Sequence, residues 1–169
     1  MIRSVLQFPD PELKKISRPV QQVDDKAVEL LTDLADTLYK TPGVGLAAPQ
    51  LGVLLRAIVV DVTWLPPRPG KAPPKGHGLI ALINPRILKQ EGTMVFREGC
   101  LSIPDFLADI QRSAHIQVEG LNRHGEQQTF DAEGFEAVAL QHEIDHLDGI
   151  LFLDRVANLK TDLISRRKK

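Results

Sequence analysis

Apolar residues recur along the chain at two spacings, and the two spacings predict different elements. Between residues 25 and 40 they return every third or fourth position, which predicts an amphipathic helix. The residues on this stripe are Val28, Leu31, Leu34, Ala35 and Leu38. Residues 135–148 contain neither glycine nor proline and are followed by Gly149 as a C-terminal cap, so they predict a second helix. Two apolar stripes along it indicate a helix that is buried on most sides.

Short runs rich in β-branched residues predict strands between these helices. They occupy residues 56–62, 78–83 and 116–121, and a further strand is expected just before Cys100. The sequence Asn-Arg-His-Gly at 122–125 has the composition of a hairpin turn. Because several short strands and turns separate the two helical patterns, we expect an α+β fold.

Residues 65–78 form a segment of a different composition. They contain five prolines and three glycines, which exclude regular structure and predict an exposed loop. A chain of 169 residues with 43% hydrophobic and 25% charged residues suits one domain with its own core. We therefore expect a single domain over residues 1–169, with the proline-rich segment as an inserted loop.

Charge and cysteine content narrow the functional classes. The net charge of −1 gives no broad electrostatic reason to bind DNA or another nucleic acid. The single cysteine permits no internal disulfide, which fits a reducing cytosol. No stretch resembles a signal peptide or is long enough to span a membrane, so we expect a cytoplasmic protein without a membrane partner.

The second predicted helix carries the pentapeptide His142-Glu143-Ile144-Asp145-His146. Side chains four residues apart on a helix project from one face, so His142 and His146 can bind one metal ion, and Glu143 can reach a water on that ion. The pentapeptide also occurs by chance on helices that bind nothing, but here both histidines continue an apolar stripe. Buried imidazoles and a carboxylate are costly without a partner, and a divalent metal is the partner we expect.

A site of this kind needs a third protein ligand. The spacing HExxHxxGxxH of one protease class places Phe152 at the ligand position, and a phenyl ring cannot coordinate. No Glu follows Glu143 and no His follows His146. The remaining candidates are Cys100, His77, His115, His124, Asp154 and Asp162.

We favour Cys100, which lies in the segment Glu-Gly-Cys-Leu-Ser at 98–102 and is presented at a turn. One cysteine and two histidines with an open fourth position form a known catalytic arrangement. A bound thiolate makes the site electron-rich and suits iron(II), zinc, nickel or cobalt. Burial as a small apolar side chain is the alternative for this residue.

A third segment, residues 43–50, reads Gly-Val-Gly-Leu-Ala-Ala-Pro-Gln. Gly43 alone fits a helix cap followed by a loop of small residues. Two glycines separated by one residue also let the backbone approach a ligand closely, and Gln50 ends the run with an amide that donates and accepts hydrogen bonds. Gln50 can therefore donate to an oxyanion.

Together these three segments resemble the signature motifs of the peptide deformylase family. Family members show GxGLAAxQ, EGCLS and QHExDHLxG in this order, and this chain has GVGLAAPQ, EGCLS and QHEIDHLDG. The resemblance extends over most of the chain, including residues 5–13 and 83–85. It implies small antiparallel sheets around a central helix that bears the HExxH sequence.

The resemblance also implies an activity: hydrolysis of the N-formyl group from the initiator methionine of nascent polypeptides, with release of formate. One divalent ion would be bound, with iron(II) as the native ion and zinc, nickel or cobalt as substitutes. The residues that would hold it are Cys100, His142 and His146. Glu143 would move the water proton, and the Gln50 side chain and the Leu101 backbone N–H would donate to the formyl oxygen.

For the substrate, the resemblance implies an apolar pocket for the methionine side chain and a backbone that pairs with the following peptide. The positions that match the family's substrate-binding residues are Val44, Gly45, Phe96, Gly99, Phe135, Val138 and Ala139. Ordinary core packing is the alternative for the apolar ones.

After EGCLSIP the family often has a basic or aromatic residue that touches the peptide, and this chain departs from that pattern with Leu107. Arg112 stands at a commonly basic position and is equally compatible with a solvated arginine.

Residues 158–169 end in Arg-Arg-Lys-Lys and are expected to form a basic tail or helix. In the family a basic C-terminal helix can dock on the ribosome, so the ribosome is an expected partner beside the N-formylmethionyl peptides. A solvated charged tail is the alternative.

Two other functions compete with deformylation. A zincin-type metalloprotease would use Asp154 as its third ligand, and loss of the Cys100 thiol would then leave metal and activity in place. A catalytically silent module would keep the fold and bind ribosomes or nascent chains through the pocket. The presence of Gln50, Cys100, Glu143 and both histidines argues against a lapsed site.

Overall fold

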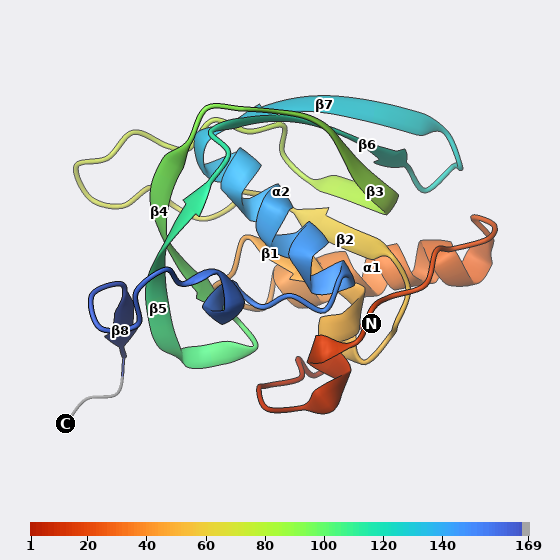
Figure 1. The fold of residues 1–169 in the computed structure, drawn as a ribbon. Coiled ribbons are helices and arrows are strands. Elements are labelled where there is room, and N and C mark those ends of the chain that lie inside the picture. The colour runs from red at the N-terminus through yellow and green to blue at the C-terminus, as the bar shows by residue number, and fades with distance from the viewer. Residues whose placement is uncertain (167–169) are drawn as a thin grey trace.

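The computed structural model, which describes residues 1–166, consists of two α-helices and two antiparallel sheets (Figure 1). The helices are α1 (Asp25–Leu38) and α2 (Gly134–Leu147). The larger sheet has the order β1-β2-β3-β6-β7, with β1 (Gly45–Ala47), β2 (Ala57–Val60), β3 (Ile80–Glu91), β6 (His115–Leu121) and β7 (Gln127–Glu133). The smaller sheet has the order β4-β5-β8, with β4 (Met94–Cys100), β5 (Ile103–Arg112) and β8 (Leu163–Ser165). Three short 3-10 helices are η1 (Pro11–Lys14), η2 (Ala48–Leu51) and η3 (Phe152–Arg155).

Helix α2 lies at the centre of the fold, with strands of both sheets around it (Figure 1). Every residue from Glu136 to Leu147 is buried, as the two apolar stripes predict. Leu140, Ile144 and Leu147 pack against β2, β3 and β6 in one core cluster. The helix therefore holds its polar residues in the interior, where hydrogen bonds must satisfy them.

Strand β2 separates two parts of the core. Its side chains alternate between faces, so Ile58 and Val60 pack in the cluster around α2, whereas Ala57 and Val59 pack in the cluster around α1. All four are buried, which explains why this strand reads as a continuous apolar run. The two helices thus cover opposite faces of the strand that leads into the proline-rich loop.

The predicted α+β fold is confirmed, and both helices lie within two residues of their predicted bounds. The three predicted runs correspond to β2, β3 and β6, but β3 continues to Glu91 beyond the predicted end at residue 83. Asn84 has φ +51° and a register shift follows it, so the strand bends there without ending. Residues 61–79 contain neither helix nor strand. Neither described helix is both long and apolar enough to cross a membrane.

The C-terminal segment has a different form from the expected tail or helix in its described part. Residues 158–162 are mainly turns, and residues 163–165 form β8, which pairs with β5. Pairing supplies hydrogen bonds to the otherwise open edge of β5, which favours a strand over a helix here. The basic residues Arg167, Lys168 and Lys169 lie outside the described residues.

Candidate active site

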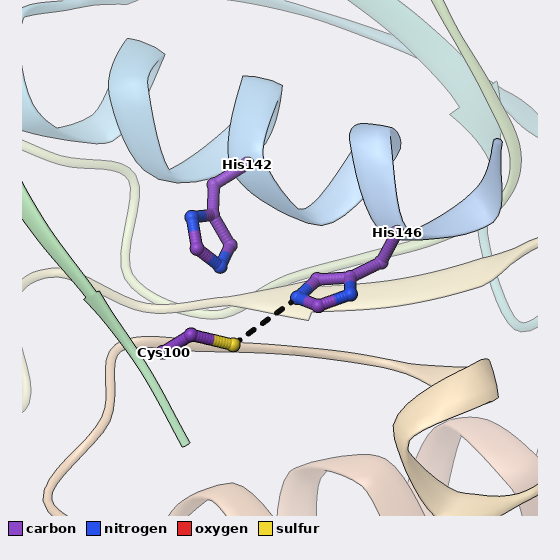
Figure 2. Close-up of side chains that lie close together, drawn as sticks. All are labelled: Cys100, His142 and His146. Atoms are coloured by element: carbon purple, nitrogen blue, oxygen red, sulfur yellow. Dashed lines mark hydrogen bonds between the residues drawn. The ribbon is translucent and has the colours of Figure 1, made fainter. Parts of the chain in front are cut away.

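Three potential metal ligands meet where the end of β4 approaches α2. Figure 2 shows the Cys100 thiol and the rings of His142 and His146 turned toward one another. Each residue offers one ligand atom, and these atoms lie within 4.8 Å of one another. Cys100 Sγ is 3.4 Å from His146 Nε2. No other such group of three occurs among residues 1–166, so the structure brings together the three residues that we favoured.

Local structure explains how β4 delivers the thiol. The β4–β5 ladder has an irregularity between Glu98 and Cys100, and Cys100 then pairs with Ile103 across a tight turn. An irregularity of this kind re-aims side chains near the end of a strand. The expected strand and turn around Cys100 are therefore present.

Glu98 lies behind His142 and was not predicted to be a functional residue. Its Oε1 atom lies 2.9 Å from His142 Nδ1. A carboxylate can only accept, so the proton belongs on Nδ1, which leaves Nε2 free to bind a metal. The signal was present in the sequence, because Glu98 opens the EGCLS segment.

Arg112 is not the solvated arginine that the sequence allowed. It is buried, and its Nε and Nη2 atoms each donate to Glu98 at 2.8 Å. Its Nη1 donates to Asp145 at 2.6 Å, and Asp145 also accepts from Arg155 Nη2 at 2.7 Å. Burial tends to raise the pKa of Glu98, but hydrogen bonds from Arg112 and His142 outweigh it and hold that pKa below its usual value. A charged carboxylate is thus kept behind His142.

Glu143 is buried beside the cluster and close to β1. A Cβ on Gly45 would stand 2.6 Å from Glu143 Oε1, so only glycine fits there. Burial is the main cause that raises the pKa of Glu143 to about 7. Its Oε2 atom has no hydrogen-bond partner among the described residues. A carboxyl group with such a pKa can both accept and return a proton near neutral pH.

The two histidines are suited to a cation between them and the thiol. Burial, followed by the charges of His142 and Arg112, holds the pKa of His146 well below its usual value, so its ring is neutral as a ligand must be. Burial also tends to lower the pKa of His142, but hydrogen bonds with Cys100 and Glu98 raise it well above its usual value. The surroundings of His142 therefore favour positive charge, which a divalent ion supplies. The residues present fit a metal ion.

Gln50 lies beside the group of three potential metal ligands. It sits in η2, and its Oε1 accepts from the Ala47 N–H at 2.9 Å, which fixes the orientation of the amide. Its Nε2 then points toward Ser102 Oγ at 3.0 Å and Cys100 Sγ at 3.6 Å. The amide N–H groups thus face the metal cluster, as expected for a donor to a reacting oxygen.

The 43–45 segment and the strand end at 98–101 face each other across the site. A Cβ on Gly43 would stand 2.9 Å from Leu101 Cδ1, so the two segments are in contact there. Among the predicted substrate-binding residues, Phe96 and Phe135 stack with ring centroids 4.9 Å apart. Val44 and Phe135 pack against the same core cluster as Ala139, and Val138 is buried.

The other candidate ligands have different partners. His77 Nδ1 lies 2.6 Å from Glu136, and His115 Nε2 lies 3.4 Å from Glu133. Both histidines line a hollow of about 700 Å³ that no member of the metal cluster lines. Asp154 pairs with Lys14 and accepts from the Leu151 N–H at 2.9 Å. His124 is exposed in the β6–β7 turn, and Asp162 accepts from the Asn158 N–H.

Comparison with known proteins assigns the arrangement to a family. The model of the polypeptide deformylase family matches residues 2–162. The chain belongs to the polypeptide deformylase family. A peptide deformylase of Bartonella tribocorum is 42% identical over 169 residues, which cover 99% of this chain and 92% of the relative. The crystal structure of the Thermotoga maritima peptide deformylase has a TM-score of 0.82 and 38% identity, and the match covers 94% of this chain and 99% of that one.

Membership of the polypeptide deformylase family defines the reaction class. The chain is a metal-dependent hydrolase that removes the N-formyl group from nascent chains. Neither a zincin-type metalloprotease nor a silent binding module is favoured by these matches. A Met-Ala-Ser-bound peptide deformylase from Acinetobacter baumannii has 31% identity and a TM-score of 0.84, with 92% of this chain and 99% of that chain covered.

Proposed function

We propose that deformylation takes place at the site formed by Cys100, His142, His146, Glu143 and Gln50. One observation carries this assignment: three ligand atoms lie within 4.8 Å of one another, beside a buried carboxyl group and a fixed amide donor. This combination provides a metal site, a proton carrier and an oxyanion donor in one place. No other part of the described chain combines a metal-binding group with such neighbours.

One divalent ion would be held by Cys100, His142 and His146. One sulfur and two nitrogen donors suit iron(II), zinc, nickel and cobalt. We propose iron(II) as the native ion, as the family resemblance implies, with the other three as substitutes. When bound, the ion would supply Lewis acidity and lower the pKa of a water molecule.

The residues of the chain move the proton and stabilise the developing charge. Glu143 takes the proton of the attacking water and returns it to the amine nitrogen as the C–N bond of the formamide breaks. The products are formate and a free amino terminus. Gln50 Nε2 and the Leu101 backbone N–H donate to the formyl oxygen, where negative charge develops.

The methionine side chain would lie in the apolar region formed by Val44, Phe96, Phe135, Val138 and Ala139. The following peptide would lie extended between the backbone at Val44–Gly45 and the backbone at Gly99, so recognition would depend little on sequence. The Met-Ala-Ser peptide in the A. baumannii relative has the composition of a deformylated product. Formyl-methionyl peptides are therefore the substrates we propose.

Nascent chains as substrates place the proposed reaction in the cytoplasm of a bacterial-type cell. The ribosome remains a predicted partner through the basic residues 166–169. Co-sedimentation with ribosomes tests this contact, with a chain shortened after Ser165 as the control. Equal sedimentation of both chains would contradict it.

Formate release from formyl-Met-Ala-Ser by protein reconstituted anaerobically with iron(II) tests the function. We expect Glu143→Ala to lower kcat by about 10² to 10⁴ while the ion stays bound. Cys100→Ala should lose both ion and activity, whereas Asp154→Ala should keep both, which is the opposite of the zincin expectation. A wild-type protein that binds metal, folds and releases no formate would overturn the proposal and favour a silent binding module.

A further inference from the structure

Arg166, the residue that follows β8, brings a positively charged side chain next to the proposed path of the substrate backbone. The strand is fixed by its pairing with β5, in which Ile164 lies opposite Leu107. The Arg166 N–H then donates to the Asp105 carbonyl oxygen at 2.8 Å, which sets the direction of the chain as it leaves β8. Arg166 Nη1 lies 4.0 Å from the point where a Cβ on Gly99 would stand. The guanidinium is therefore held next to Gly99.

In the proposed binding mode the substrate backbone would lie along Gly99. It precedes the metal-site residue Cys100, and it is exposed although its neighbour Glu98 is buried. Without a side chain its peptide groups are open to an extended chain. A guanidinium beside Gly99 is thus close to the path of residues that follow the methionine.

Leu107, in β5, and Arg166, just after β8, both approach Gly99. Leu107 Cδ2 lies 2.8 Å from the position of a Cβ on Gly99, so its apolar side chain fills the space next to the backbone. Arg166 is exposed, so its guanidinium is accessible to a ligand from solvent. The residue after β8 therefore brings positive charge to a place that β5 lines with an apolar side chain.

We propose that Arg166 is a specificity residue that binds a carboxylate on the peptide downstream of the methionine. The proposal rests on the proposed function, because it needs the peptide to lie along Gly99. A guanidinium matches a carboxylate with two parallel N–H donors. Since Arg166 is exposed, water and salt weaken the pair, and we expect a preference of about two- to fivefold in kcat/KM.

The carboxylate can come from an acidic side chain or from the end of a short peptide, and paired substrates separate the two sources. Formyl-Met-Ala-Glu amide and formyl-Met-Ala-Gln amide differ in one charge and have the same shape. A second pair places Glu or Gln directly after the methionine. Formyl-Met-Ala-Ser as free acid and as amide tests the terminal carboxylate.

The variants are Arg166→Ala, Arg166→Lys and Arg123→Ala. Arg123 is exposed in the β6–β7 turn and controls for the loss of one positive charge. We expect Arg166→Ala to abolish the preference for the charged member of at least one pair of substrates. The change should appear as a higher KM for the charged peptide, and kcat for the neutral peptides should be unchanged. Arg166→Lys should restore part of the preference, and Arg123→Ala should keep all of it. Higher ionic strength should reduce the wild-type preference.

The result that overturns the inference is equal preference in wild type and Arg166→Ala across all three pairs. Failure of the proposed function is a different result, namely no formate release from any of the peptides. In that case the preference is measured by calorimetry with Met-Ala-Glu amide and Met-Ala-Gln amide on zinc-loaded protein. Loss of the Glu preference in Arg166→Ala would support the role of Arg166 in binding, and unchanged or absent preference would reject it.

Discussion

At the scale of single residues, the missing side chain of Gly45 gives the Glu143 carboxylate its position. A Cβ there would lie 2.6 Å from Glu143 Oε1 and 2.8 Å from its Cγ, closer than van der Waals contact allows. Gly45→Ala must therefore displace the carboxylate from the position in which we propose that it transfers a proton. We expect kcat to fall about 100-fold, because small errors in position are costly at a reacting centre. Metal content should stay at the wild-type level.

Gly43→Ala is the matched control for this prediction. Its Cβ would stand 2.9 Å from Leu101 Cδ1 and 3.1 Å from Leu101 Cγ, and a leucine side chain can adjust more easily than a buried carboxylate. We expect a smaller loss of kcat than for Gly45→Ala. Formate release and metal analysis on both variants give the comparison, and equal losses would show that Glu143 is not specifically constrained by Gly45.

The group of three potential metal ligands could be predicted from the sequence because it depends on residue type and spacing. His142 and His146 lie four residues apart, so they share a face of any helix that contains both. Cys100 is the only cysteine in the chain. The role of Arg112 could not be predicted in this way. Its partners, Glu98 and Asp145, come from another strand and from α2, so only the folded structure shows that they are in contact.

At the scale of elements, the buried charges of Glu98, Arg112 and Asp145 join β4, β5 and α2 behind His142, and the exposed Arg155 extends this network to η3. Glu98→Gln removes one carboxylate from Arg112 and changes the acceptor for His142 Nδ1. We expect metal affinity to fall about 10- to 100-fold, because such partners orient the ligand and raise its basicity. Breaking a buried pair should also cost about 3–5 kcal/mol of unfolding free energy.

Asp109→Asn provides the control for Glu98→Gln, because it breaks a pair on the same two strands at the surface. Arg97 and Asp109 are 58% and 31% exposed, so their pair should contribute at most about 1 kcal/mol. Chelator competition gives the metal affinity, and denaturant titration gives the stability. A Glu98→Gln protein with wild-type metal affinity would show that Glu98 is structural only.

A second contact between elements predicts a pH effect. The Tyr39 hydroxyl, just after α1, donates to Asp61 at 2.8 Å at the start of the proline-rich loop region. Burial, and then this hydrogen bond, raise the pKa of Tyr39 to about 12. Because the folded pKa is raised, the contact stabilises the fold fully below about pH 10 and is lost as the pH rises through about 12.

Tyr39 is the only tyrosine, so tyrosinate absorbance reports on it directly. We expect the folded protein to titrate close to pH 12 and Asp61→Asn to titrate nearer the ordinary value, because the acceptor charge is removed. Asp25→Asn, an exposed change at the start of α1, should leave the titration unchanged. If Tyr39 titrated in Asp61→Asn at the same pH as in the wild type, burial alone would set this pKa.

At the scale of the whole molecule, the sequence predicts the α+β class and the central helix but not how the strands are shared between two sheets. β5 was not predicted, because the order of polar and apolar residues in residues 103–112 gives no clear alternation. β7 is largely polar, and its place depends on pairing with β6 along its whole length. The order of polar and apolar residues within one segment does not show which distant segment it pairs with.

The division into two sheets makes the metal site a link across the fold. Cys100 ends β4 in the smaller sheet, whereas His142 and His146 lie on α2, which packs against the larger one. An ion bound to all three residues would stabilise the folded state and not the unfolded chain, in which the three residues are apart. At 100 times its dissociation constant it should contribute about 2.7 kcal/mol, which corresponds to a Tm increase of roughly 5–10 °C.

Removal of the ion by a chelator should therefore lower Tm by this amount, and scanning calorimetry before and after chelation measures it. Cys100→Ala should lose most of the difference between the two scans, because the link to the smaller sheet is gone. Asp154→Ala, whose side chain pairs with Lys14 outside the cluster, should keep the full difference. If Cys100→Ala kept the wild-type difference, the ion would bind on α2 alone and would not join the two sheets.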